Sequence, residues 1–392
     1  MKNVCTFRVV FFFTLFLSLP GYAGGGSEPE PQSPTPASAP NLPPQWAQEF
    51  TTDFSQTLVD FGEIVFGGPS KDGIPALDKP RFESPTEASG WLKPREPVMV
   101  VSLEEGTKVY PLQILMWHEI VNDTLGTQPI AVTWCPLCNT GVVFSRRLPG
   151  GEVVDFGTTG RLRFSNLIMY DRQSESWWQQ AEGRGIIGRY AGTQLGLVGS
   201  LTLPWNQAME AFPEAQVLSR ITGFPRSYGA NPYQGYDTAA TPFLYQGPEF
   251  DTTRPAMERA LVLFIDDHPL SLAYSLIEEK KVIQVETSSG PLVVLWTDDV
   301  LSPLSAGRIA QGTISGSANA FWSRSRGGTI LTLDTTLRDE ETGTQWTPSG
   351  LGIWGPLAGE KLEAFPGIQH FWFSASAFGS LMIQDLPKGE FP

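Results

Sequence analysis

Two cysteines three positions apart are the residues of this chain best suited to chemistry. They stand in the segment Cys135-Pro136-Leu137-Cys138, and the third cysteine, Cys5, lies in an apolar N-terminal stretch. Two thiols at this spacing can form a tight disulfide, act as a redox pair or hold a soft metal ion. The spacing therefore leaves several uses open: a disulfide that braces a turn, a metal site, a catalytic dithiol, or a thiol nucleophile for hydrolysis.

A metal site is the preferred hypothesis among these, and it needs more ligands than two sulfurs. His118 is the expected third ligand, because thiolate and imidazole together suit copper or zinc. Glu119 or Asp171 is then expected to complete the site or to support its ligands. The opposing interpretation is structural, since a single histidine on a buried helix is more often a hydrogen-bonded core residue.

A redox pair is the alternative hypothesis, with Cys135 attacking a disulfide and Cys138 resolving the intermediate. In thioredoxin-like proteins the first cysteine opens a helix, which lowers the pKa of its thiol. Here Asn139-Thr140-Gly141 follow, and then a run typical of a strand. The pattern therefore argues against a thioredoxin fold, although a dithiol on another scaffold can still exchange with partners.

Short runs of β-branched and aromatic residues, separated by Gly, Asn or Pro, predict the strands that position the cysteines. These runs span residues 98–103, 130–134, 142–146, 153–156 and 162–169. One helix is expected over residues 110–122, with Pro111 in its first turn and Asn122-Asp123 at its end. The cysteines are thus expected on a turn between two strands of a β-rich α+β fold.

The chain also contains what we interpret as an internal repeat. The runs 98–101 and 109–112 resemble 261–264 and 273–276, and 130–134 resembles 292–296. The polar turn from Asp171 to Trp178 resembles the segment from Asp339 to Trp346, which favours a structural role for Asp171. The second copy lacks the cysteines and has Glu278-Glu279 where the first has His118-Glu119. We expect two similar lobes from an internal duplication, with the chemistry in the first.

The N-terminal sequence predicts that the protein is exported from the cytoplasm. Lys2 and Arg8 precede a short apolar stretch, and Gly21-Tyr22-Ala23 suits a signal-peptidase site. The predicted organisation is a signal peptide at 1–23, a disordered Pro/Ser/Gly linker at 24–45, a first lobe at 46–230 and a degenerate second lobe at 231–392. The expected location is periplasmic or extracellular, where thiols tend to be oxidised.

The amino-acid composition restricts the kinds of binding partner that we expect for this chain. The formal net charge of −14 repels phosphate backbones, so nucleic acid is not expected as a partner. No later apolar run is long enough for a membrane span, so the mature chain is expected to have no transmembrane segment. The expected partner is a small molecule or another envelope protein.

Five motifs in a fixed order resemble the DUF3179 family of secreted bacterial and archaeal proteins. They are Ile74-Pro75-Ala76-Leu77, Tyr110-Pro111-Leu112, Trp117-His118-Glu119-Ile120-Val121-Asn122-Asp123, Thr133-Trp134-Cys135-Pro136-Leu137-Cys138 and Met169-Tyr170-Asp171-Arg172. The resemblance runs from about Asp72 to the C-terminus. It implies that the histidine-containing and cysteine-containing motifs belong together, and it implies no reaction.

Overall fold

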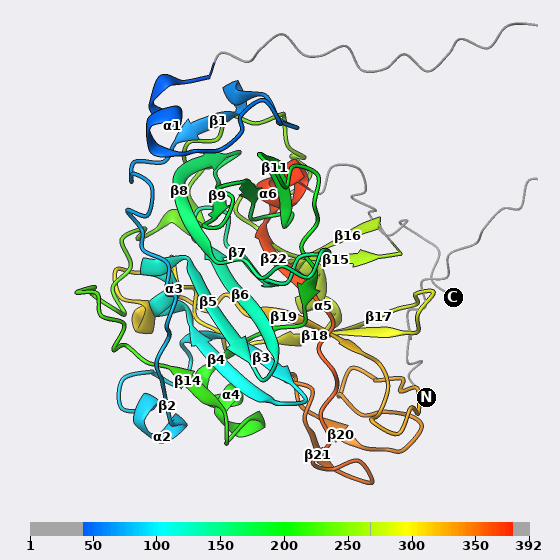
Figure 1. Cartoon of the computed structure of the whole chain (residues 1–392). Helices are drawn as coiled ribbons and strands as arrows, with labels where there is room; N and C mark the ends of the chain where they lie inside the picture. The colour runs from blue at the N-terminus through cyan, green and yellow to red at the C-terminus, as the bar shows by residue number, and fades with distance from the viewer. Residues whose placement is uncertain (1–41, 267, 379–392) are drawn as a thin grey trace, which may run out of the picture.

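The chain forms five β-sheets over the residues that this computed structural model describes, which are 42–266 and 268–378 (Figure 1). The helices between them are short, so the expected β-rich α+β fold class is confirmed. The predicted signal peptide at 1–23 and all but the end of the predicted linker at 24–45 lie outside the described residues.

The sheet that holds the cysteines combines strands from both ends of the chain. Its order is β16 (His268–Ala273), β15 (Arg259–Ile265), β22 (Gly367–Phe371), β7 (Thr140–Ser145), β6 (Gln128–Cys135) and β5 (Ile120–Leu125), with β12 (Leu197–Val198) also paired to β7. The first and second parts of the chain join where Gln369 of β22 pairs with Gly141 of β7. The continuous sheet thus crosses the predicted boundary at residue 230.

The other sheets surround this one. The second has the order β13 (Leu201–Pro204), β3 (Pro97–Leu103), β4 (Gly106–Pro111), β14 (Gln216–Leu218) and β2 (Phe82–Glu83). The third has the order β1 (Ile64–Phe66), β8 (Phe156–Arg163), β9 (Asn166–Asp171), β10 (Trp177–Gln179) and β11 (Arg184–Ile187). The last two are β17 (Val282–Val285), β18 (Leu292–Thr297) and β19 (Ser317–Trp322), and the pair β20 (Gln345–Trp346) and β21 (Gly352–Trp354).

Short helices connect these strands. The α-helices are α1 (Pro44–Glu49), α2 (Pro85–Ala88), α3 (Leu112–His118), α4 (Trp205–Ala211), α5 (Tyr274–Lys280) and α6 (Trp372–Phe378), and the 3-10 helices are η1 (Phe61–Glu63), η2 (Tyr236–Thr238) and η3 (Ile309–Gln311). In the described part of the chain, every helix falls short of the length and apolar character that crossing a membrane requires.

The helix predicted over residues 110–122 is shorter than expected. It covers Leu112–His118 and stops at Glu119, whose φ of 57° lies in the left-handed region. The Glu119 amide still bonds the Leu115 carbonyl at 2.7 Å, and the chain then continues as strand β5. The β-branched Ile120 and Val121 suit that strand, and pairing with β6 overrides the helical pattern.

The strand predicted over residues 162–169 is in fact a hairpin. Arg163 pairs with Asn166, so Phe164 and Ser165 form a two-residue turn with φ values of 51° and 65°. Such turns favour Gly or Asn because both central residues have positive φ, and this one has neither. The sequence therefore gives no turn signal here.

The two parts of the chain repeat the order strand, strand, helix, strand, strand. In the first part, β3 pairs with β4 so that Val98 lies opposite Pro111, and helix α3 follows directly. In the second, β15 and β16 pair Ala260 with Ala273, and α5 follows directly. Both helices have seven residues. The strand pairs and helices therefore correspond residue by residue.

The correspondence extends to the residue that ends each helix. Lys281 ends α5 with a φ of 63°, as Glu119 ends α3. His118 and Glu119 therefore correspond to Lys280 and Lys281. The correspondence with Glu278-Glu279 expected from the sequence is wrong, because the two helices match in length without a shift.

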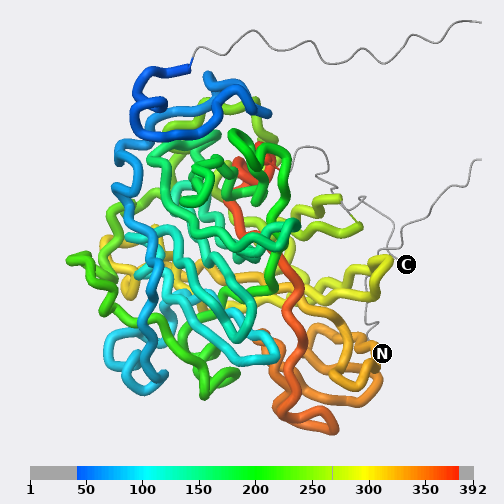
Figure 2. Tube along the Cα trace, in the orientation of Figure 1, coloured from blue at the N-terminus to red at the C-terminus, as the bar shows by residue number. Residues whose placement is uncertain are grey.

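The last strand and helix return to the first part of the chain. Figure 2 shows the orange to red end of the tube running back beside the green strands. There β22 lies between β15 and β7, and Phe371 and Phe373 join the core cluster that also holds both cysteines. The cysteine site is consequently enclosed by the first and the last parts of the described chain.

Candidate functional site

The two cysteines occupy the turn of the β6–β7 hairpin. Cys135 pairs with Thr140 as the last step of the ladder, so residues 136–139 form the connecting turn. The Asn139 amide bonds the Pro136 carbonyl at 3.3 Å, and Asn139 has a φ of 48°. Proline fixes the start of such a turn and asparagine tolerates its left-handed end. The expected placement on a proline-containing turn is thus what the structure shows.

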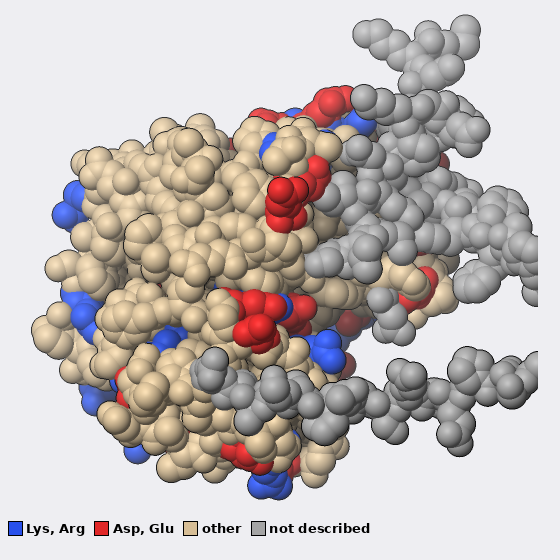
Figure 3. Space-filling model, turned by 90° about the horizontal axis from the view of Figure 1, so that it is seen from above, with Lys and Arg blue, Asp and Glu red and all other residues tan. Residues whose placement is uncertain are grey.

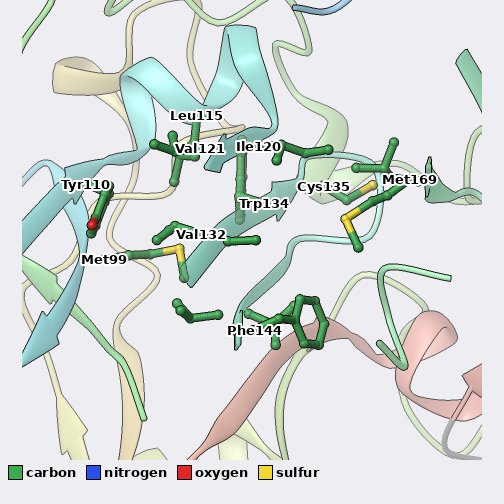
Figure 4. Packing of buried hydrophobic residues seen from close by; sticks show 14 of the residues in the cluster. Met99, Tyr110, Leu115, Ile120, Val121, Val132, Trp134, Cys135, Phe144 and Met169 are labelled. Carbon is green, nitrogen blue, oxygen red and sulfur yellow. The ribbon is translucent and has the colours of Figure 1, made fainter. Parts of the chain in front are cut away.

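Both thiols are buried, free and close to each other. Cys135 is 1% exposed and Cys138 is 0% exposed, and they form no disulfide in this structure. In the close view of Figure 4, the Cys135 side chain lies among apolar side chains, with Met169 as a neighbour. Water is therefore excluded from the sulfurs, and their surroundings decide their chemistry.

The pKa values of the two thiols are shifted in opposite directions. Burial raises the pKa of Cys135, but hydrogen bonds with the Cys138 side chain and with the backbone of Cys138, Leu167 and Leu137 outweigh it and lower the pKa. Burial raises the pKa of Cys138 well above its usual value, and interaction with Cys135 raises it further. The first cysteine is accordingly the more acidic thiol of the pair and the second is the less acidic one.

The Phe164-Ser165 turn of the neighbouring hairpin faces the two sulfurs. The Cys135 thiol points to the Ser165 carbonyl and the Cys138 thiol to the Phe164 carbonyl, each at 3.9 Å. Both residues have positive φ, and such strained non-glycine residues concentrate at functional sites. Sequence analysis missed this turn because residues 162–169 read as one strand.

Glu119 supplies the carboxyl group of the site. Its side chain is 7% exposed, and within residues 42–266 and 268–378 no group donates a hydrogen bond to its carboxyl. Burial raises the pKa of Glu119 well above its usual value, and the charge of Cys135 raises it further. Glu119 is therefore a largely buried carboxyl whose protonated form is favoured.

His118 faces away from the cysteines. Its Nδ1 bonds the Pro75 carbonyl at 2.7 Å and its Nε2 bonds the Tyr228 hydroxyl at 2.7 Å. Because the carbonyl only accepts, Nδ1 carries the proton and Nε2 accepts from Tyr228. Burial lowers the pKa of His118 to about 4, so the ring is neutral. His118 is a satisfied core histidine.

The expected ligand set is therefore not assembled. Among the described residues, no three His, Cys, Asp or Glu side chains are placed so that they could hold a metal ion. In this structure His118 is not placed beside Cys135 and Cys138 as a ligand, because both of its ring nitrogens are bonded elsewhere.

Asp171 stabilises its own turn. Its carboxylate accepts bonds from the Ser174 amide at 2.6 Å, the Ser174 hydroxyl at 2.9 Å and the Trp178 indole at 3.0 Å. Asp339 accepts the same three kinds of bond, from Thr342 and Trp346. The structural role expected for the Asp171 turn fits these bonds, and its carboxylate is already used within the turn.

The C-terminal strand and helix add residues that the sequence analysis did not single out. The Phe371 amide bonds the Cys138 carbonyl at 2.7 Å, and the Ser374 side chain hydrogen-bonds Cys138. His370 places its Nδ1 3.0 Å from the Thr140 hydroxyl and 3.2 Å from that of Ser374. Burial lowers the pKa of His370 to about 3, so this second buried histidine is also neutral. His370 lies near the cysteine turn only because strand β22 pairs with β7.

Residues 231–250, which we call the cover segment, close the site from outside. The Tyr236 hydroxyl donates to the Leu137 carbonyl at 3.0 Å, within the cysteine turn. Burial and the charge of Cys138 raise the pKa of Tyr245 to about 12. Burial and the charges of Glu119 and Cys135 likewise raise the pKa of Tyr233. Three tyrosines of the segment thus lie next to the buried pair.

The fold and site define a β-rich protein with a buried dithiol on a hairpin turn. The family model for the protein of unknown function DUF3179 matches residues 71–380, and the chain belongs to this family. The match includes the cysteine turn, Glu119 and the C-terminal strand. No curated protein and no solved structure matches the chain.

Proposed function

We propose that the protein is an exported dithiol–disulfide redox protein of the periplasm or cell exterior, with Cys135 as the attacking and Cys138 as the resolving residue. The observation that carries the proposal is the pair of adjacent, free thiols whose pKa values are shifted in opposite directions. A structural brace needs only a disulfide, and it does not need two thiols of different acidity.

The proposed exchange has two steps. The Cys135 thiolate attacks one sulfur of a partner disulfide, which forms a mixed disulfide and releases the first partner thiolate. The Cys138 sulfur then attacks Cys135, which forms the Cys135–Cys138 disulfide and releases the second partner thiolate. The proton of the Cys138 thiol goes to one released thiolate, and the other takes up from solvent the proton that Cys135 lost on ionisation. The partner disulfide is reduced by two electrons and the protein dithiol is oxidised by two.

Glu119 fits this exchange as a proton store. Its carboxyl is largely buried, and burial together with the charge of Cys135 raises its pKa, which favours the protonated form. When the disulfide is reduced again, a buried carboxylic acid can donate a proton to the sulfur that is released and then regain one from solvent. The same carboxyl has no evident use in a turn that is only braced.

Copper or zinc fits the described residues less well. Zinc in proteins takes four ligands or three plus water, and no third ligand joins the cysteines. Copper(I) bound by the two sulfurs is the remaining metal candidate, because soft thiolates suit it. We therefore derive no step through a metal, and the experiment below separates the two proposals.

The test is the intact mass of the chain, isolated without chelator or reductant and then equilibrated in redox buffers of dithiothreitol and glutathione. A redox protein changes reversibly by two hydrogens, at a potential set by the Cys135–Cys138 pair. A chain that retains one copper ion and resists oxidation supports the metal candidate instead. A chain that never forms the disulfide in any buffer contradicts the redox proposal.

A trapping variant tests the division of roles. Cys138→Ser is expected to accumulate a mixed disulfide with a partner, because the resolving sulfur is absent. Cys135→Ser is the matched control and is expected to accumulate much less, because Cys138 is mostly protonated. Equal trapping by both variants contradicts the assigned order.

The proposal includes an internal duplication, in which the second copy became a scaffold. It is supported by the equal strand registers and helix lengths of the two parts. It is also supported by the matching pairs Pro97 with Pro204 on β3 and Arg259 with Phe371 on β15. The second copy ends β18 at Thr297, where the first ends β6 at Cys135, so the proposed chemistry belongs to one copy.

A further inference from the structure

The connection that covers the thiols is long and irregular. Between the end of β14 at Leu218 and the start of β15 at Arg259, the only helix or strand is η2. Loops of this length in a folded protein are usually functional, because ordering them costs entropy that packing must offset. The cover segment is the middle of this connection.

Both ends of the cover segment are fixed to the body. The Asn231 amide bonds the Gly307 carbonyl at 3.0 Å. Just beyond the other end, the Asp251 amide bonds the Ser376 hydroxyl of α6 at 2.8 Å. The first part of the segment is fixed as well, because the Gly235 amide bonds the Leu304 carbonyl at 2.8 Å and Asp237 pairs with Arg259 at 3.3 Å. Only residues 238–250 can therefore move as an arch.

Two side chains hold the arch closed. The Tyr236 hydroxyl donates to the Leu137 carbonyl at 3.0 Å and accepts from the Phe243 amide at 3.1 Å. The Ser165 hydroxyl donates to the Phe243 carbonyl at 2.6 Å. Both latches join the arch to turns that contact the cysteines. Each is a hydrogen bond of ordinary strength, so breaking it costs little compared with unfolding.

The arch also has a strained and exposed tip. Leu244 has a φ of 54°, a conformation that non-glycine residues rarely adopt. Phe243 is 54% exposed, although both thiols beneath the segment are almost fully buried. Inward, the Tyr245 ring lies 5.5 Å from that of Phe373 and 6.3 Å from that of Phe164. Leu244 and Tyr245 pack against the main core cluster, so Phe243 is the residue of the tip that gains little from burial.

We infer that the cover segment is a gate over Cys135 and Cys138, latched by Tyr236 and Ser165, which opens to admit the reacting disulfide. The inference deepens the proposed function, because it concerns access to the same thiols. Its test is nevertheless independent of redox activity.

The test is the rate at which iodoacetamide alkylates the two thiols of the native, reduced chain. Removing one latch by Tyr236→Phe or Ser165→Ala is expected to raise this rate roughly threefold to tenfold, the value of one ordinary hydrogen bond. Thr238→Val is the matched control, because the Thr238 hydroxyl bonds only Gly235 within the same segment. Its rate should equal that of the wild type.

Cleavage of the arch provides a second measurement that needs no variant. Chymotrypsin cuts after exposed aromatic residues, so a brief digestion of the native chain should cut at Phe243. The cut chain, still folded by circular dichroism, should then be alkylated fast. The gate is rejected if neither the latch variants nor the cut changes the alkylation rate. A chain that shows the gate but forms no disulfide in redox buffers contradicts only the proposed function.

Discussion

At the scale of the residue, the two parts of the chain differ in the side chain that ends the helices α3 and α5. Glu119 and Lys281 end equivalent helices in the same left-handed conformation, so this backbone conformation belongs to the architecture. Only the side chains differ. Lys281 pairs with Asp298 at 2.7 Å on the surface, whereas Glu119 is buried and senses the charge of Cys135. The chemical difference between the two parts therefore lies in the carboxyl and the sulfurs.

Glu119→Gln is expected to make stability less dependent on pH. A carboxyl with a raised pKa in the folded state binds its proton more tightly there, so its contribution is complete below the usual value of 4.5 and is lost as pH rises toward the folded pKa. The wild type should therefore lose free energy of unfolding above that value, and the glutamine variant should lose less. Urea denaturation across this range measures the difference. Parallel pH profiles for the two proteins would contradict a buried, protonated Glu119.

At the scale of the element, two strained turns form the site. The cysteine turn has Asn139 at a φ of 48°, and the facing turn has Phe164 and Ser165 at positive φ. A turn of fixed shape holds the two sulfurs at a fixed separation, which a redox pair requires. The helix α3 and the strand β22 then supply Glu119 and the backbone contact to Cys138. Rigid elements thus place each group, and the turns set the geometry.

Asn139→Val is expected to destabilise the fold by about 1–2 kcal/mol, because a β-branched residue is disfavoured in the left-handed conformation. Asn139→Gly is the matched comparison, since glycine adopts that conformation without a steric cost. Denaturant titration gives the stability, and the redox midpoint of the Cys135–Cys138 pair reports the turn geometry. If valine and glycine behave alike in both, the conformation of Asn139 is not what holds the turn.

At the scale of the whole molecule, a continuous sheet connects the first and last parts of the chain. Strands β15, β16 and β22 extend the sheet that begins with β5, β6 and β7. On the face shown in Figure 3, charged side chains are scattered in small groups among uncharged ones. The cysteine site is closed by packing between the first and last parts of the described chain.

Unfolding is expected to be a single cooperative transition, because neither part of the central sheet is complete without the other. Denaturation followed by tryptophan fluorescence and by thiol alkylation should give the same midpoint. As a control, the segment 46–230 produced alone should show no cooperative transition, since it exposes the edge of β7 that β22 covers. Two separate transitions in the full chain would overturn this expectation.

The sequence by itself determined the family, the fold class and the position of the cysteines, because these depend on local patterns. Alternating strand runs, the Pro-Leu turn and the ordered motifs are all read from neighbouring residues. The same local evidence placed Glu119 among the residues near the site. It could not show that the ring nitrogens of His118 are bonded to Pro75 and Tyr228, residues far from it in the sequence.

Only the tertiary structure decided what surrounds the thiols. Ser374 reaches Cys138 and His370 reaches Thr140 because β22 inserts beside β7, and Tyr236 of the cover segment bonds Leu137 in the cysteine turn. The Phe164-Ser165 turn escaped notice because tertiary packing, and not a Gly or Asn signal, holds it at positive φ. The pKa values of the thiols follow from burial and from contacts between distant segments. A local sequence pattern contains neither, which is why the chemistry of the cysteines emerged only from the fold.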